Sequence, residues 1–322
     1  MTDLGELVTI AFILDSNIEC PFKEEKADSV EEDGEDIKDD DASTEPVAEA
    51  QENNGGKLGQ NLSKGLNGSK GTWNAPAPEE GEGQKSLRED SKPDGKLQVS
   101  VDAAGGYSAG WYPFIQAAHH LIPGNGSLTP SKLYKTYMVE SGKVTAGGVQ
   151  FTMEDNIGYN VNGAHNGVWL PGNYAIRKKK DKTHASPDKG KSWSDLPPDW
   201  QVEYMEAAME KSKGQFHDAH TTYNENIRSA LDKLFVAIEA HQAICEECQK
   251  GGDKKIPPPY FLKGYLYGIS EWLKAKLGPF TEASDEPPSW YTSDAYFGFR
   301  WGDDRVAKYA SGSPAKKHKP NE

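Results

Sequence analysis

At residues 117–123 the chain reads Ala117-Ala118-His119-His120-Leu121-Ile122-Pro123, a short apolar run that holds two adjacent histidines. In an extended segment successive side chains point to opposite faces, so we expect His119 and His120 to have different partners. Neutral imidazole is a good ligand for divalent transition metals, and histidine is also suited to act as a general base near neutral pH. The run therefore predicts that one histidine binds a metal while the other activates a water molecule.

A second pair of histidines, His217 and His220, lies three positions apart. Residues at this spacing share one face of a helix, and we predict a long helix from about 216 to 249 with an apolar stripe. On that helix the two side chains could bind one ion together, provided that the strand and the helix pack side by side. The histidines at 165, 184 and 318 fall in predicted loops or in the tail, where a structural or surface role is the simpler interpretation.

Three motifs follow one another along the chain: Gln116 to Pro123, then Asn166-Gly167-Val168-Trp169-Leu170-Pro171, then His217-x-x-His220-x-x-Tyr223-Asn224. Taken in this order, they resemble the AHH nucleases of the HNH/endonuclease VII superfamily, and the similarity extends from about residue 107 to residue 234. The resemblance implies an α+β fold with a ββα-metal core and long flanking helices. In such a core two strands and a helix clasp one divalent ion, here magnesium or zinc.

The resemblance also implies a role for each site residue. His119 would be a metal ligand, His120 the general base, and Asn166 the residue that holds the loop bearing the base. His217 and His220 would complete the metal site from the helix. In the family the helix histidines are more often four positions apart, which leaves His220 the better supported ligand of the two.

The acidity of the chain is confined to its first third. Of 50 acidic and 36 basic residues, 25 acidic and 10 basic ones lie in residues 1–106, which leaves 25 acidic and 26 basic ones for residues 107–322. The net charge of −14 therefore does not argue against a nucleic-acid substrate for the second part. Residues 23–96 contain hardly any large apolar side chain, and we predict disorder there because too little surface can be buried to offset the ordering entropy.

The composition predicts four parts: a short docking strand over 1–22, a disordered acidic linker over 23–106, an AHH-type nuclease domain with a helical C-terminal extension over 107–310, and a disordered basic tail over 311–322. Within the nuclease domain, apolar spacing, glycines and prolines predict an extended segment over 111–123, a strand over 149–153, a basic surface insertion over 174–193, and helices over 128–138, 200–213, 216–249 and 260–277. We expect Asp199 to cap the helix that begins at Trp200.

Three features have two interpretations each. His241, Cys245 and Cys248 share a helical face and could hold a structural zinc, although small residues on a packed helix explain the cysteines equally well. The run Arg177 to Lys180 could bind the phosphates of a nucleic-acid backbone or be a solvated basic loop. The acidic block over 31–41 is a solubilising linker in the simpler interpretation and an electrostatic mimic of nucleic acid in the other.

Several enzyme classes are excluded by missing motifs. The sequence has no His-Glu-x-x-His metalloprotease motif, no phosphate-binding glycine loop before a helix and no Gly-x-Ser-x-Gly elbow. We expect a metal-dependent endonuclease that hydrolyses nucleic acid, DNA in the first place, with little sequence specificity. The alternative is a non-catalytic, metal-stabilised binding or adaptor protein with an acidic recruitment arm.

The chain has three cysteines, and its short apolar run at residues 8–14 has neither the length nor the flanks of a signal peptide or a membrane span. We therefore expect synthesis in a bacterial cytoplasm and no membrane association. The family resemblance implies a secreted toxin or effector that reaches its target cell through a secretion system such as type VI, with a carrier or chaperone. It also implies an immunity protein as a partner.

Overall fold

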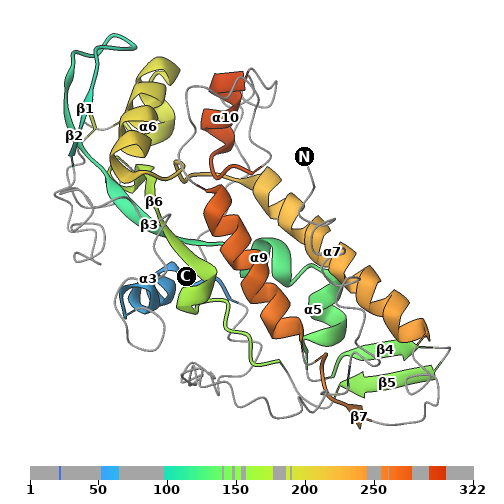
Figure 1. Ribbon diagram of the computed structural model, residues 1–322. Coiled ribbons are helices and arrows are strands. Elements are labelled where there is room, and N and C mark those ends of the chain that lie inside the picture. The colour runs from blue at the N-terminus through green and yellow to red at the C-terminus, as the bar shows by residue number, and fades with distance from the viewer. Residues whose placement is uncertain are drawn as a thin grey trace. The chain divides into compact units, whose positions relative to one another are not determined.

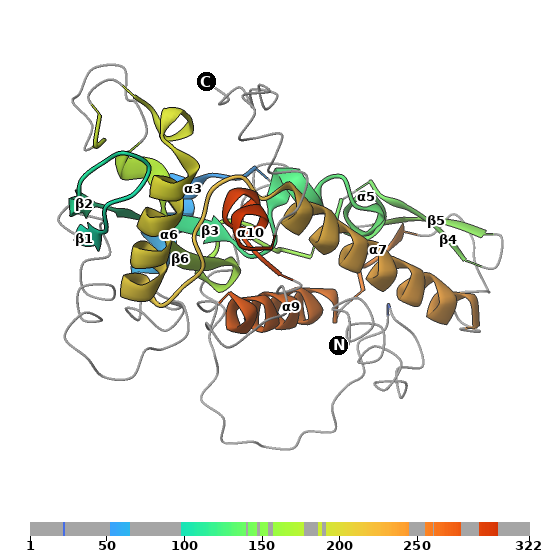
Figure 2. The ribbon, with the colours of Figure 1, turned by 90° about the horizontal axis from the view of Figure 1, so that it is seen from above.

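The structure is a computed structural model that combines helices with small sheets (Figure 1, Figure 2). It describes residues 22, 52–64, 98–139, 141–146, 149–153, 157–176, 186–188, 191–244, 255–259, 261–277 and 290–301. The fold class is α+β, as the sequence predicts. Within these residues, no helix has both the length and the apolar character that crossing a membrane requires.

Contacts divide the chain into two compact units, and each unit combines three separate stretches of sequence. Unit 1 consists of Met1–Trp73, His120–Val168 and Asn224–Lys274, and unit 2 consists of Asn74–His119, Trp169–Tyr223 and Ala275–Glu322. Stretches that are far apart in the sequence therefore build each core.

Unit 1 contains a three-stranded sheet and most of the longest helix. Strand β4 (Lys143–Ala146) pairs antiparallel with β5 (Val149–Met153), and β5 pairs parallel with β7 (Lys255–Ile256). The helices are α5 (Lys132–Tyr137), α7 (Thr221–Ile244) and α9 (Leu262–Lys276). Strand β5 has the predicted limits, α5 is shorter than predicted, and α9 lies within its predicted range.

The apolar stripe predicted for the long helix is present in α7. Ile227, Leu231, Leu234 and Ile238 recur at helical spacing and are fully buried. The side chain of Ser131 accepts the Tyr134 N–H and caps α5, which provides a partner for one of the main-chain donors left over at a helix start. Local signals in the sequence thus predicted that these two helices exist, although both begin later than predicted.

An additional helix of unit 1, α3 (Gly55–Lys64), lies inside the stretch for which we predicted disorder. Leu58 and Leu62 are four positions apart, share one face of α3 and are both buried, and α3 packs against the 3-10 helix η3 (Ala164–Asn166). The Asn54 side chain accepts the Lys57 N–H at the start of the helix. The prediction of disorder is wrong here because the average composition of a long polar segment conceals two well-spaced leucines.

Unit 2 packs a hairpin against a helix. Strand β1 (Gln98–Val101) pairs antiparallel with β2 (Gly110–Pro113), and α6 (Pro198–Ser212) lies against β1 and contacts α10 (Asp294–Trp301). The core between these elements is rich in aromatic side chains, among them Phe114, Trp200, Tyr204 and Phe216. Strand β1 also falls within residues 23–106, for which we predicted a disordered linker.

The start of α6 differs from its predicted form. The helix begins at Pro198, its N-cap residue is Pro197, and Asp199 lies in the first turn. Asp199 was therefore not the capping residue that we expected. A proline at the first helical position costs no hydrogen bond there, and an acidic side chain in the first turn still favours the helix dipole.

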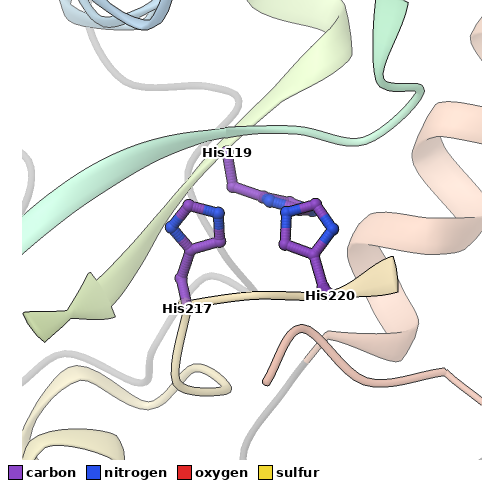
Figure 3. A group of neighbouring side chains, drawn as sticks. All are labelled: His119, His217 and His220. Atoms are coloured by element: carbon purple, nitrogen blue, oxygen red, sulfur yellow. The ribbon is translucent and has the colours of Figure 1, made fainter. Parts of the chain in front are cut away.

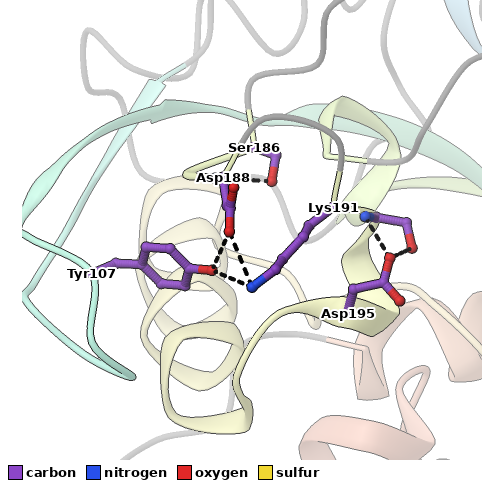
Figure 4. A network of polar contacts seen from close by, with 6 residues as sticks. Tyr107, Ser186, Asp188, Lys191 and Asp195 are labelled. Atoms are coloured by element: carbon purple, nitrogen blue, oxygen red, sulfur yellow. Dashed lines mark hydrogen bonds and ion pairs between the residues drawn. The ribbon is translucent and has the colours of Figure 1, made fainter.

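A polar network lies on the surface of unit 2, near the end of the basic insertion predicted over 174–193 (Figure 4). The Asp188 carboxylate lies 3.0 Å from Lys191 Nζ and accepts the Tyr107 hydroxyl at 3.4 Å. The hydrogen bond that Lys191 donates to the Asp188 carboxylate is the main cause that raises the pKa of Lys191. The ammonium group of Lys191 is thus paired with Asp188 at the surface of unit 2.

Several predictions concern residues outside the described ranges. These are the docking strand over 1–21, the acidic block over 31–41, the run Arg177 to Lys180, the three cysteines and the tail over 311–322. They remain predictions, as do the predicted limits of the nuclease domain.

Candidate metal centre

The two histidines of the opening run lie on β3 (Ile115–His120), which pairs with β6 (Gly167–Gly172) in a two-stranded sheet. His119 is 2% exposed and His120 is 8% exposed, so both side chains are buried. A strand places consecutive side chains on different sides, and the surroundings of the two histidines differ accordingly.

His217 and His220 lie in an extended segment ahead of α7, whereas we predicted them on the helix. The His217 N–H donates to the Pro171 carbonyl at 2.7 Å, and a parallel bridge joins His217 to Gly172 at the end of β6. His220 directly precedes the first residue of α7. The two histidines therefore share a site through extended backbone beside β6, and not through helical periodicity.

Main-chain hydrogen bonds explain why the helix starts only at Thr221. The Asp218 N–H donates to the Thr292 carbonyl, and the Asp294 N–H donates to the Ala219 carbonyl. The Asp294 carboxylate accepts the Thr221 N–H at 2.8 Å and so caps the first turn of α7. These groups find their partners in a segment more than 70 residues away, which single-sequence periodicity does not reveal.

His119, His217 and His220 form a cluster within unit 2 (Figure 3). One ring nitrogen from each histidine lies within 4.8 Å of those of the other two, with His119 buried and the others half-buried. The ring centroids are 4.8 Å apart for His119 and His217, 5.0 Å for His119 and His220, and 5.2 Å for His217 and His220. His119 enters from β3, and the other two enter together from the facing extended segment.

His120 has a different environment within unit 1. Its Nε2 lies 2.9 Å from the Asn162 Oδ1, and Asn162 is 2% exposed. The two histidines of the run therefore have separate partners, in agreement with the alternation of side chains along a strand.

Asn166 holds the backbone directly after His120. Its Oδ1 accepts the Ile122 N–H at 2.8 Å, and its Nδ2 donates to the carbonyls of Ile122 at 2.9 Å and Val161 at 2.8 Å. The Leu121 N–H donates to the Asn166 carbonyl at 2.9 Å. A fully buried amide with this many main-chain partners fixes the path of the chain that follows His120.

Residues 104–251 match a nuclease family of the HNH/ENDO VII superfamily with conserved AHH. These residues belong to the AHH nuclease family. The matched stretch includes His120, Asn166 and all three histidines of the cluster, so the family recognised from the sequence motifs is confirmed. Comparisons with curated proteins and with solved structures found no match.

The histidine cluster in the matched stretch fits a divalent metal. With metal–nitrogen bonds of about 2.0–2.1 Å, two ligand nitrogens of a tetrahedral site lie roughly 3.3 Å apart. Nitrogens that already lie within 4.8 Å of one another reach this separation through small rotations of the rings. Among the described residues, the group contains no carboxylate, and an all-imidazole set suits zinc and its neighbours better than magnesium, which prefers oxygen.

Aromatic side chains that the sequence analysis did not single out pack against the cluster. The ring of Tyr223 meets His119 edge to face at 5.2 Å and His220 at 5.6 Å, and Tyr174 stacks on His217 at 6.3 Å. Trp290 packs edge to face on Tyr223 at 6.0 Å. Tyr223 belongs to the third sequence motif, and its place three residues after His220 was the available signal for a contact with the site.

Two other histidines lie apart from the cluster. His165 is buried against the rings of Tyr159 and Tyr267, with centroids 5.1 Å and 4.3 Å away, so its structural interpretation agrees with its packing. His241 lies on α7, and the cysteines with which it could bind zinc are outside the described residues.

Proposed function

We propose that the protein is a metal-dependent endonuclease that hydrolyses phosphodiester bonds in nucleic acid, DNA in the first place. His119, His217 and His220 hold the metal, and His120 is the general base. The observation that carries the proposal is the three-histidine cluster, built from a strand and a distant segment within residues of an AHH nuclease.

The arrangement of the backbone supports this division of roles. His119 and His120 are consecutive residues of β3, with Cα atoms about 3.8 Å apart, and their side chains have the separate surroundings that two different roles require. When bound, a divalent ion neutralises the charge that develops on the phosphate. His120 accepts a proton from the attacking water, and Asn166 keeps the chain beyond His120 in place. We see no array of base-reading side chains among the described residues and expect little sequence specificity.

The direct test is cleavage of plasmid DNA and of structured RNA by the purified full chain, with zinc, manganese, magnesium or a chelator. We expect metal-dependent cleavage that falls by about 100-fold or more in His120→Ala, since general base catalysis contributes about 10²–10⁴-fold. His318→Ala, in the predicted tail, is the matched control and should keep wild-type activity. Metal binding without cleavage in any condition would instead favour the non-catalytic binding protein.

We also propose that the nuclease is a secreted bacterial toxin that an immunity protein neutralises. The support is the toxin context that the family resemblance implies, together with the acidic first third of the chain as a segment for delivery or docking. Expression in bacteria should arrest growth and degrade cellular DNA, and His120→Ala should abolish both effects. Growth unaffected by an active wild-type enzyme would contradict the toxin role and leave the nuclease activity standing.

A further inference from the structure

One hydrogen-bond partner of His120 is a buried asparagine that the motifs do not include. His120 Nε2 and Asn162 Oδ1 lie 2.9 Å apart, and the side chains are 8% and 2% exposed. An imidazole nitrogen can either donate or accept, and an asparagine amide offers an oxygen or a nitrogen depending on its orientation. The protonation of His120 therefore depends on which way the Asn162 amide points.

Two main-chain contacts determine the orientation of that amide. The Asn54 N–H donates to Asn162 Oδ1 at 2.9 Å, and Asn162 Nδ2 donates to the Glu52 carbonyl at 2.9 Å. A main-chain N–H can only donate and a main-chain carbonyl can only accept. If the Asn162 amide were rotated by 180°, its Nδ2 would face the Asn54 N–H and its Oδ1 would face the Glu52 carbonyl, and neither pair could form a hydrogen bond. Oδ1 is therefore the atom that meets His120.

We propose that Asn162 is a positioning residue, held by the N-terminal segment 52–61, that keeps the proton of neutral His120 on Nε2 and its lone pair on Nδ1. The proposal rests on the role of His120 as the general base. The argument is one of hydrogen-bond chemistry: because Oδ1 can only accept, Nε2 must donate, and a neutral imidazole has a single N–H.

The proposal assigns the proton transfer to one atom. A proton of the attacking water passes to Nδ1 while the water oxygen bonds to phosphorus, and His120 becomes an imidazolium whose Nε2–H still donates to Asn162. The broken phosphorus–oxygen bond leaves its electron pair on the sugar oxygen, which takes a proton from solvent. Asn162 touches neither substrate nor metal in this step, and it acts only through the orientation and tautomer of His120.

The segment that holds Asn162 lies outside the family match. Besides the contacts of Glu52 and Asn54, Asn61 Nδ2 donates to the Asn162 carbonyl at 2.8 Å, and Asn53 Oδ1 accepts the Gly124 N–H at 2.6 Å. Residues 52–61 precede the match by more than 40 positions. The support for the base in this chain thus comes in part from helix α3 and the residues before it, and not from the nuclease motifs alone.

The first experiment reads the tautomer directly. Long-range ¹H–¹⁵N spectra of the full chain, metal-free and zinc-loaded, with His120 assigned by comparison with His120→Ala, should show a protonated Nε2 and an unprotonated Nδ1 in neutral His120. The opposite tautomer in the wild-type protein would overturn the proposal. This readout does not require activity, so it remains decisive if the protein cleaves no nucleic acid and the proposed function fails.

The second experiment separates positioning from stability. Asn162→Ala should lower kcat by about 10- to 100-fold with little change in KM, the effect expected when a partner that orients a functional histidine is lost, and should mix the two tautomers. Gln242→Ala removes another buried amide of unit 1, which accepts the Tyr137 hydroxyl, and should lower stability without changing kcat or tautomer. Equal kcat values for the two variants would contradict the positioning role while leaving the nuclease function intact.

A conservative variant covers the case in which Asn162→Ala does not fold. Asn162→Asp retains an oxygen that accepts from both His120 and Asn54, replaces the donor to the Glu52 carbonyl by a second acceptor, and adds a negative charge that favours a protonated Nε2. It should keep Nε2 protonated. A folded Asn162→Asp protein with its His120 proton on Nδ1 would overturn the proposal.

Discussion

At the scale of single residues, buried asparagines hold the main chain near the histidines through their side-chain amides. Asn166 and Asn162 both use their side-chain amides on main-chain groups, and Asn162 also meets His120. An amide offers donors and an acceptor in one plane without carrying charge, so it can be buried fully once every group has a partner. The conformation around His120 is therefore maintained by neutral hydrogen bonds.

The cost of losing Asn166 can be predicted from its partners. Asn166→Ala leaves the Ile122 N–H and the carbonyls of Ile122 and Val161 buried without this amide, and each such group costs roughly 1–3 kcal/mol. We expect the free energy of unfolding to fall by about 3 kcal/mol or more in urea denaturation. Ser270→Ala, which loses one bond to Asn166 Oδ1, should cost about 1 kcal/mol. Comparable losses of unfolding free energy in the two variants would refute the role of Asn166 in holding these three main-chain groups.

At the scale of elements, the histidine cluster depends on how a strand end meets an extended segment. The bridge between Gly172 and His217 places the ligand-bearing chain beside β6. A Cβ atom added at Gly172 would lie 3.0 Å from the His217 carbonyl oxygen and 2.9 Å from a ring carbon of Tyr174. The glycine therefore permits a close approach of backbone on which the position of His217 depends.

Gly172→Ala should displace His217 and weaken zinc binding, by an amount on the order of 10-fold, which is typical for changes next to a metal ligand. Gly214→Ala is the matched control, because its added Cβ would meet the flexible end of Leu170 at 3.1 Å and no backbone atom closer than 3.9 Å. Calorimetric titration of the metal-free proteins with zinc measures the zinc affinity of both variants. The same zinc affinity for Gly172→Ala and wild type would rule out that the position of His217 depends on this glycine.

Elements with strong local signals were predictable, and those fixed by distant partners were not. The strand at 149–153, the stripe of α7 and the helix near 262–276 follow from alternation and helical spacing. The start of α7 was misplaced because Asp294 and Thr292, more than 70 residues away, bind the backbone around His217 and His220. Helix α3 was missed because two leucines are a weak signal until a surface is present to bury them.

At the scale of the whole molecule, a metal bound only by the folded chain must stabilise it. The cluster joins residues almost 100 positions apart, so an unfolded chain cannot present the same site. Each unit is itself assembled from three stretches of sequence, and the three histidines of the cluster all belong to unit 2. Metal binding is therefore coupled to the assembly of that unit.

Thermal unfolding should show this coupling. Zinc at about 100 times its dissociation constant should stabilise the protein by about 2.7 kcal/mol, and a chelator should remove the effect. Magnesium at the same concentration should give a much smaller increase, because the described ligands are imidazoles. His119→Ala should unfold at the same temperature with and without zinc. Identical midpoints for zinc-loaded and chelator-treated wild type would contradict a metal site in this cluster.

The sequence by itself determined the α+β class, the AHH nuclease family and the five candidate residues His119, His120, Asn166, His217 and His220, because motifs in a fixed order carry that information locally. Only the tertiary structure decided how the three histidines of the cluster meet and what faces His120. His217 and His220 converge with His119 through extended backbone, and Asn162 meets His120 with its amide oriented by residues 52 and 54. These contacts join segments some 100 residues apart, and neither helical nor strand periodicity encodes a hydrogen bond across such a distance.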